Sequence, residues 1–394
     1  MARVAFFVES LPPTDDLIGR FAFALARSLA EQQHEILIFS TQTPGHPGPP
    51  PTSHLAGGLA IATPFRNWGW VEAARAMPAL MRFRPDVLHF VQPHAAVLEG
   101  WTSAVTALAA AAPALGLPVV AASFFDLRGA WRTRHRALLL SCHAMTAANT
   151  RQLDAIRAEC GNARPLLATV PLGMIDDDAA RFDEPNAALS ELMAHADRKL
   201  LLVPGDVDAH TDPQRLFKII AHVLKARPRA AVAITGGWGS VAPTARFRLL
   251  SSLGDDAGAR FALLCANGST RGAIMRQTSA IFGATLGLET LVFAEAARDA
   301  IKQNLLFVAT REQAIAEPQA SAILRIAEDR EEALVDAALA ALDSDPTLSE
   351  RAIPAAERAR RELNDDPANV ISRLYAQAIT DRRRSQRERS YFSK

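Results

Sequence analysis

The segment formed by residues 200–239 constrains the fold of this chain more than any other part of the sequence. An apolar run, Leu200–Val203, ends shortly before Gly205, and a second apolar run ends at Gly236 and Gly237. Between the two runs, apolar residues recur at helical spacing as Leu216, Ile219, Ile220 and Val223. This pattern predicts a strand, a helix and a parallel strand, and strands that are apolar on both faces are typical of a sheet covered by helices. Because ligands of such sheets bind beyond the carboxyl ends of the strands, we expect the glycine loops to line a binding site. Glycines there let a ligand approach the backbone closely, and a tight turn is the alternative explanation.

The same alternation of short apolar runs and helical stripes extends from Arg3 to Ala309. It predicts an α/β protein with two doubly wound, Rossmann-like domains. We place the N-terminal domain at residues 1–177 and the C-terminal domain at residues 178–365. Residues 366–394 are predicted to form a C-terminal helix and a basic tail. Beyond Ala320 the pattern of apolar residues predicts helices only.

The end of the chain is strongly basic. Its last fourteen residues hold six basic and two acidic side chains and carry no apolar stripe. Such a run of charge is typical of a solvated or disordered tail, and contact with anionic lipid or nucleic acid is the alternative.

Composition excludes several classes of protein. With 394 residues, of which 49% are hydrophobic, the chain can bury two ordinary cores. A net charge of +1 gives no general attraction to nucleic acid. The three cysteines form no CxxC pair, which fits reduced thiols in a cytosol better than disulfides. No apolar run reaches the roughly 20 residues that a bilayer requires. We therefore expect a cytoplasmic protein with at most peripheral contact at the inner face of the membrane.

Several motifs occur in an informative order. They are PDVLH at 85–89, VPLGMID at 170–176, the strands that end at Gly205 and at Gly236-Gly237, and FAEAARDA at 293–300. In order and spacing this succession resembles glycosyltransferase family 4, whose members are retaining transferases of the GT-B type. The resemblance implies two Rossmann-like domains that face a cleft, with a helical C-terminal return segment. It also implies that the C-terminal domain binds a nucleotide sugar, such as a UDP- or GDP-sugar, and that the N-terminal domain takes the acceptor. The resemblance further implies a reaction in which no metal takes part.

The resemblance also implies cations for the diphosphate of the donor. In the family, an arginine and a lysine follow the first strand of the C-terminal domain as G-R-x(4)-K and stabilise the leaving group. The matching positions here hold Asp206 and Thr211, and a carboxylate repels a diphosphate. Arg215 and Lys218 on the following helix are the cations that could reach back, with a solvated helix face as the alternative for both.

A pair of glutamates eight positions apart is the next implied device. The first contacts the donor sugar and the second contacts the ribose. Glu295 matches the second glutamate, whereas Gly287 stands at the first. Glu289 is the candidate for the missing carboxylate if the loop has slipped by two residues. Otherwise its place near a helix N-terminus explains it.

Two positions of the N-terminal domain also depart from the family. Phe125 stands near the place of a histidine that the family keeps in its site, and an aromatic ring cannot relay a proton. The first loop lacks the usual glycine pair, and only Gly19 is left to bring backbone N–H groups close to phosphate. His89 lies in a strand, where a histidine is more often structural than catalytic.

Two functional hypotheses follow. In the favoured hypothesis, the chain is a glycosyltransferase-like protein of bacterial glycan, surface polysaccharide or glycoconjugate synthesis. It has lost catalysis and acts as a binding or assembly partner, for example of an active glycosyltransferase. In the alternative, it is an active retaining transferase with displaced site residues, moving a sugar from a nucleotide donor to a glycan, lipid or protein.

Overall fold

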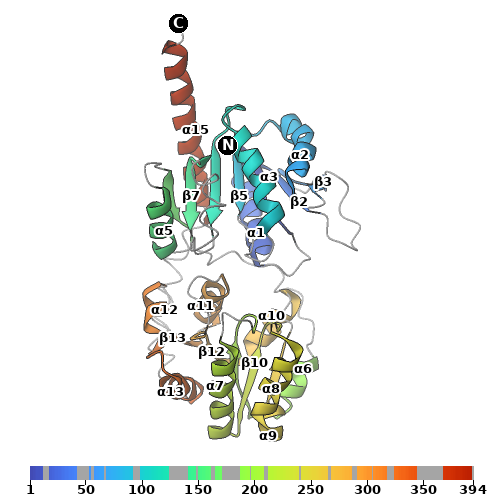
Figure 1. The fold of residues 1–394 in the computed structure, drawn as a ribbon, viewed down its shortest axis with the longest axis vertical. Coiled ribbons are helices and arrows are strands. Elements are labelled where there is room, and N and C mark those ends of the chain that lie inside the picture. Colours follow the sequence, from blue (N-terminus) through green and yellow to red (C-terminus); the bar gives the residue numbers. More distant parts are fainter. Residues whose placement is uncertain are drawn as a thin grey trace. The chain divides into compact units, whose positions relative to one another are not determined.

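The computed structural model describes residues 1–11, 17–41, 53–54, 57–65, 68–91, 98–123, 141–147, 150–160, 165–170, 187–195, 197–207, 212–238, 241–264, 268–285, 291–303, 305–316, 324–343 and 367–392. The chain divides into two compact units (Figure 1). Unit 1 contains Met1–Asp176 together with Asp365–Lys394, and unit 2 contains Asp177–Asn364. Residues 366–394, which the sequence predicts as a separate segment, belong to the same unit as the N-terminal part of the chain.

Unit 1 is a parallel sheet with helices. Its described elements are β1 (Arg3–Phe7), α1 (Leu17–Glu31), β2 (Glu35–Thr41), β3 (Ser53–His54), β4 (Leu59–Phe65), α2 (Trp70–Phe83), β5 (Val87–Val91), α3 (Leu98–Ala111), β6 (Val119–Ser123), β7 (Ala144–Ala147), α5 (Thr150–Cys160), β8 (Leu166–Thr169) and α15 (Pro367–Phe392). The strand order is β3-β4-β2-β1-β5-β6-β7-β8, and within the described residues only the short β3 runs antiparallel to its neighbour.

Aromatic residues fill the centre of this sheet. Phe7 is paired in register with Phe39 on β2 and with Phe90 on β5. Their ring centroids lie 4.9 Å and 4.8 Å from that of Phe7, and all three side chains are fully buried. Strands this apolar on both faces belong in a sheet covered by helices, as the sequence predicts.

Unit 2 has the same architecture. Its described elements are α6 (Ala187–Leu192), β9 (Lys199–Val203), α7 (Pro213–Ala226), β10 (Ala230–Ile234), α8 (Pro243–Leu253), α9 (Asp255–Gly258), β11 (Phe261–Leu263), α10 (Gly268–Gln277), β12 (Thr278–Phe282), α11 (Leu291–Gln303), β13 (Leu306–Thr310), α12 (Arg311–Ala316), β14 (Leu324–Ala327) and α13 (Glu331–Leu342). The order is β11-β10-β9-β12-β13-β14, with every described pair parallel.

The predicted strand, helix and strand at residues 200–239 are confirmed as β9, α7 and β10. Helix α7 begins after Asp212, whose side chain accepts a hydrogen bond from the Arg215 N–H at 3.3 Å, and Pro213 occupies its first turn. Its apolar stripe is buried against the sheet, through Leu216, Phe217, Ile219, Ile220, Val223 and Leu224.

Two expectations for the end of the chain need correction. Strand β14 follows Ala320, where only helices were expected, because its four residues LRIA also read as part of a helical stripe. The basic end is not disordered either, since α15 remains helical to Phe392, whereas its residues 383–385 are exposed, as expected of a solvated run of charge. The helix expected at residues 354–363 lies outside the described residues.

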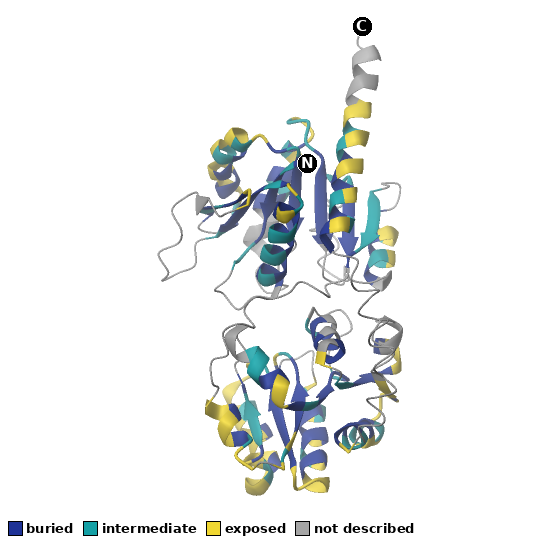
Figure 2. Ribbon diagram, turned by 180° about the vertical axis from the view of Figure 1, so that it is seen from behind, coloured by how far each residue is buried: buried dark blue, intermediate teal, exposed yellow. Residues whose placement is uncertain are grey.

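Helix α15 packs on unit 1 through its first half. The buried residues are Ala368, Ile371, Leu374, Tyr375 and Ala378, and exposed residues follow them towards the C-terminus (Figure 2). Among the described helices, none combines the length and the apolar character needed to span a membrane.

Candidate functional site

The loops that follow β9 and β10 are locked together at the carboxyl edge of the unit 2 sheet. A Cβ atom on Gly236 would lie 2.2 Å from the carbonyl oxygen of Gly205, so only glycine allows this approach. Gly205 itself has a φ of 89°, in the left-handed region. The Gly237 carbonyl accepts a hydrogen bond from the Val207 N–H at 2.8 Å. The structure therefore brings three predicted site residues, Gly205, Gly236 and Gly237, to one place.

Asp206 occupies the centre of this junction. Its Oδ1 accepts a hydrogen bond from the Gly237 N–H at 2.6 Å, and the residue is exposed. Backbone N–H groups of glycine loops are the usual donors to phosphate, and here one of them already binds a carboxylate of the chain itself. The carboxylate also adds negative charge at the edge where a ligand of this sheet would bind.

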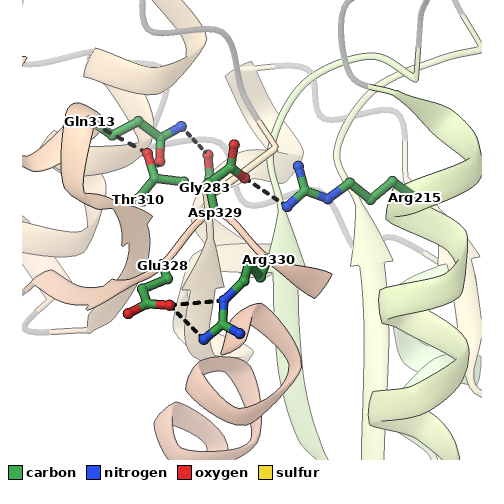
Figure 3. A network of polar contacts seen from close by, with 7 residues as sticks. All are labelled: Arg215, Gly283, Thr310, Gln313, Glu328, Asp329 and Arg330. Carbon is green, nitrogen blue, oxygen red and sulfur yellow. Dashed lines mark hydrogen bonds and ion pairs between the residues drawn. The ribbon is translucent and has the colours of Figure 1, made fainter. Parts of the chain in front are cut away.

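Arg215 is turned towards another carboxylate. Its Nη2 donates to Oδ1 of Asp329, just after β14, at 2.7 Å (Figure 3). Its charge is thus balanced within unit 2. Lys218, three residues further along α7, is exposed.

A buried glutamine joins the next two strands at the same edge. The Gln313 side chain accepts a hydrogen bond from the Thr310 N–H at 2.8 Å and donates to the Gly283 carbonyl at 2.9 Å (Figure 3). It thereby ties the ends of β12 and β13 together. Glu328 and Arg330 form a further pair beside it, at the end of β14.

Glu295 is buried on α11 and is held by an arginine that sequence reasoning missed. Arg271 on α10 contacts Oε1 of Glu295 at 2.5 Å, and its Nε donates to Oδ2 of Asp299 at 2.9 Å. Burial alone lowers the pKa of Arg271, but Asp299 and Glu295 outweigh burial and hold the pKa above its usual value. The sequence did contain a signal, because two carboxylates four residues apart on a buried helix face require a cation.

In unit 1, Gly19 allows α1 to approach the residues after β1. A Cβ at this position would lie 2.5 Å from the carbonyl oxygen of Ser10. His89 on β5 is fully buried, and its Nδ1 lies 2.5 Å from the Tyr375 hydroxyl on α15. Burial lowers the pKa of His89 to about 3, so the ring is neutral at physiological pH and joins two elements of the fold.

Four residues of the predicted site lie outside the described residues: Thr211, Phe125, Gly287 and Glu289. Within the described ranges, no group of three or more potential metal ligands comes together.

Comparison with known proteins decides the fold. Residues 18–173 match the family model of Glycosyltransferase Family 4. The chain is structurally similar to sucrose-phosphate synthase from Thermosynechococcus elongatus, with a TM-score of 0.70 and 14% identity, over 97% of this chain and 100% of the other. It is also similar to an E. coli structure described as trehalose-6-phosphate bound with UDP-2-fluoro glucose, with a TM-score of 0.67 and 11% identity, over 95% and 99% of the two chains. The chain has the GT-B fold. The fold inferred from the motifs is confirmed, and the family resemblance is supported over residues 18–173. No curated protein matches the sequence.

The GT-B fold does not by itself decide the reaction. A putative UDP-N-acetylglucosamine 2-epimerase from Listeria monocytogenes also matches, with a TM-score of 0.57 and 14% identity, over 93% of this chain and 98% of the other. At such identities the likeness establishes the fold alone, so function has to be argued from the residues of the site.

Proposed function

We propose that this GT-B protein is a glycosyltransferase relative that has lost catalysis and serves glycan synthesis as a binding or assembly partner, for instance of an active glycosyltransferase. The observation that carries the proposal is the hydrogen bond between the Asp206 carboxylate and the Gly237 N–H at 2.6 Å. A donor diphosphate at this edge would meet a fixed negative charge where the family has an arginine.

The neighbouring cations support the proposal. Arg215 faces Asp329, and Arg271 faces both Glu295 and Asp299. An arginine that turned from its carboxylate to a diphosphate would give up that ion pair, and this is costly for Arg271 because Glu295 and Asp299 are buried. Lys218 is a single exposed charge and offers little in water.

Titration calorimetry with UDP- and GDP-sugars tests the proposal. We expect no saturable binding to the unmodified protein. Asp206→Asn keeps the acceptor for Gly237 and removes the charge, so it separates repulsion from loop geometry. Asp206→Arg with Thr211→Lys adds two charge-assisted contacts, each worth about 1.5–3 kcal/mol, and should tighten binding by about a hundredfold or more.

The matched control places the same charges elsewhere. Asp336→Arg with Thr244→Lys changes two exposed positions of unit 2, on α13 and α8, and should not produce binding. A hydrolysis assay accompanies each titration, and we expect no turnover from any variant. Micromolar affinity together with turnover by the unmodified protein would overturn the proposal.

An active retaining transferase is the second candidate, and two observations favour it. Glu295, the counterpart of the ribose-binding glutamate, is held in a fixed position by Arg271, and a similar E. coli structure contains UDP-2-fluoro glucose. In this case Glu289 would take the place of the missing carboxylate. Turnover that falls in both Glu295→Gln and Glu289→Gln would support this candidate, whereas turnover unaffected by either would exclude these roles.

A further inference from the structure

Helix α2 of unit 1 presents an apolar face to solvent. Trp70 is 72% exposed and Met81 is 55% exposed, and Ala74 and Pro78 between them are also exposed. The spacings of four, four and three residues place these side chains along one side of the helix. Val71, which is 48% exposed, widens the stripe. A contiguous apolar stripe of this kind on a helix surface marks an interaction site more often than chance exposure.

The opposite side of α2 fixes its orientation. Ala73, Ala76 and Leu80 are buried in the unit 1 core. The helix packs against α3 and β4. The exposed stripe therefore cannot be buried by rotating the helix, because rotation would bring Ala73, Ala76 and Leu80 into water. The stripe is a surface of the folded unit.

The exposed charged side chains of α2 and its C-terminus are all positive. Arg75 and Arg82 are exposed and flank the stripe, and Arg84 is exposed at the helix C-terminus. Glu72, the acidic residue of α2, is buried and is paired with Arg75. The exposed face thus combines a tryptophan, smaller apolar side chains and arginines.

Two carboxylates near the C-terminal end of α2 have partners in unit 1. Arg3 lies over the Phe83 ring, 4.8 Å from its centroid, and its Nε contacts Glu35 at 2.9 Å. The Asp86 carboxylate accepts a hydrogen bond from the Arg3 backbone N–H at 2.9 Å. The Arg3 guanidinium balances the charge of Glu35, and the backbone holds the Asp86 carboxylate in place.

We propose that the exposed face of α2 docks on an anionic lipid surface. Tryptophan is favoured at the boundary between acyl chains and water, and arginines beside it attract anionic headgroups. A second copy of the chain fits the face less well. A twofold contact through α2 would bring Arg82 and Arg84 of one copy close to those of the other, and Glu72, the carboxylate of α2, is already paired with Arg75. This inference does not depend on whether the protein binds or transfers a sugar.

Vesicle sedimentation of the full chain tests the proposal. We expect binding to vesicles of phosphatidylcholine mixed with phosphatidylglycerol, weak binding to phosphatidylcholine alone, and release from the anionic vesicles when salt is added. Trp70→Ser with Met81→Ser should lower the partition coefficient about tenfold or more, because two apolar side chains no longer enter the interface. Arg82→Glu should lower it by about tenfold on anionic vesicles only.

The control is an equally exposed aromatic residue on the other unit. Phe247 on α8 is 73% exposed, and Phe247→Ser should leave vesicle binding unchanged. A melting curve of each variant checks that it is folded. Unchanged binding by the Trp70→Ser, Met81→Ser variant would overturn the proposal. Loss of vesicle binding on deletion of residues 382–394 would also overturn the proposal, because it would assign the membrane contact to the basic end of α15. Concentration-dependent dimers without vesicles, abolished by the same double substitution, would assign the face to a second copy.

Discussion

Two adjacent glycines in the loop after β10 serve different purposes. A Cβ on Gly236 would lie 2.2 Å from the Gly205 carbonyl oxygen, whereas a Cβ on Gly237 would meet, among the described residues, only the Asp206 side chain at 3.7 Å. The first distance is a clash with backbone, and the second is an ordinary contact. Gly236 is therefore required for packing of the loops, and Gly237 contributes its N–H to Asp206.

This difference gives a matched pair of substitutions. We expect Gly236→Ala to lower the free energy of unfolding by about 1–3 kcal/mol, because the β9 and β10 loops must move apart. Gly237→Ala should change it by less than about 0.5 kcal/mol. Urea unfolding followed by circular dichroism measures both. Equal losses in the two variants would contradict the loop geometry described above.

His89 makes the stability of unit 1 depend on pH. Its pKa is lowered by burial to about 3 in the folded chain, against about 6.5 in the unfolded chain. Between these values the unfolded chain binds more protons, so stability falls as pH decreases below about 6.5. Burial also lowers the pKa of His34 and His143, so these two residues likewise make stability fall as pH decreases.

We expect the free energy of unfolding to fall by up to about 1.4 kcal/mol per pH unit for His89 between pH 6.5 and 5. The double variant His89→Phe, Tyr375→Phe removes the titrating group and its hydroxyl partner together, so no buried polar atom of this pair is left unpaired. In this variant, the slope of the free energy of unfolding against pH should be smaller by the contribution of about one proton. The exposed His195→Ala variant is the control and should keep the wild-type slope at His89. Urea unfolding at each pH provides the values, and equal slopes in the double variant and the wild type would exclude His89 as the source.

At the scale of elements, helix α15 is buried against unit 1 in its first half and exposed after it. Its first half closes unit 1 through Tyr375, which is fully buried, and through polar contacts that join Asn369 to Gln32 and Ser372 to His34. Its second half leaves the core after Ala378 (Figure 2). Beyond Asp381, Arg382 donates to the Pro113 carbonyl at 2.7 Å in an exposed setting.

Deletion after Asp381 should therefore cost little. We expect a loss below about 1 kcal/mol, since the Arg382 hydrogen bond is exposed and no apolar face described beyond Asp381 is uncovered. Tyr375→Ala should cost about 3–5 kcal/mol, because it leaves a cavity and an unpaired His89 nitrogen. Differential scanning calorimetry compares the two. A large drop in melting temperature on the deletion would show that the basic end is docked.

At the scale of the whole molecule, periodicity predicted the fold well where strands are apolar and helices have stripes. Strand β14 was not predicted, because four residues are too few to distinguish the helical period from the strand period. The candidate site was harder to predict. The sequence shows that Asp206 carries a charge that repels a diphosphate. Its hydrogen bond with the Gly237 N–H could not be predicted, because it depends on two loops that meet only in the folded sheet. Arg271 stands in a segment without a motif, and its role appears only when α10 lies beside α11.

Unit 1 is assembled from two stretches of chain with the whole of unit 2 between them. A ribosome delivers the chain from its N-terminus, so unit 2 is synthesised before Tyr375 leaves the exit tunnel. Until then the surface around His89 has no cover, and the nascent chain carries one complete unit and one open unit. A premature stop anywhere in unit 2 would leave that surface exposed permanently, and such a fragment would be a target for chaperones and proteases.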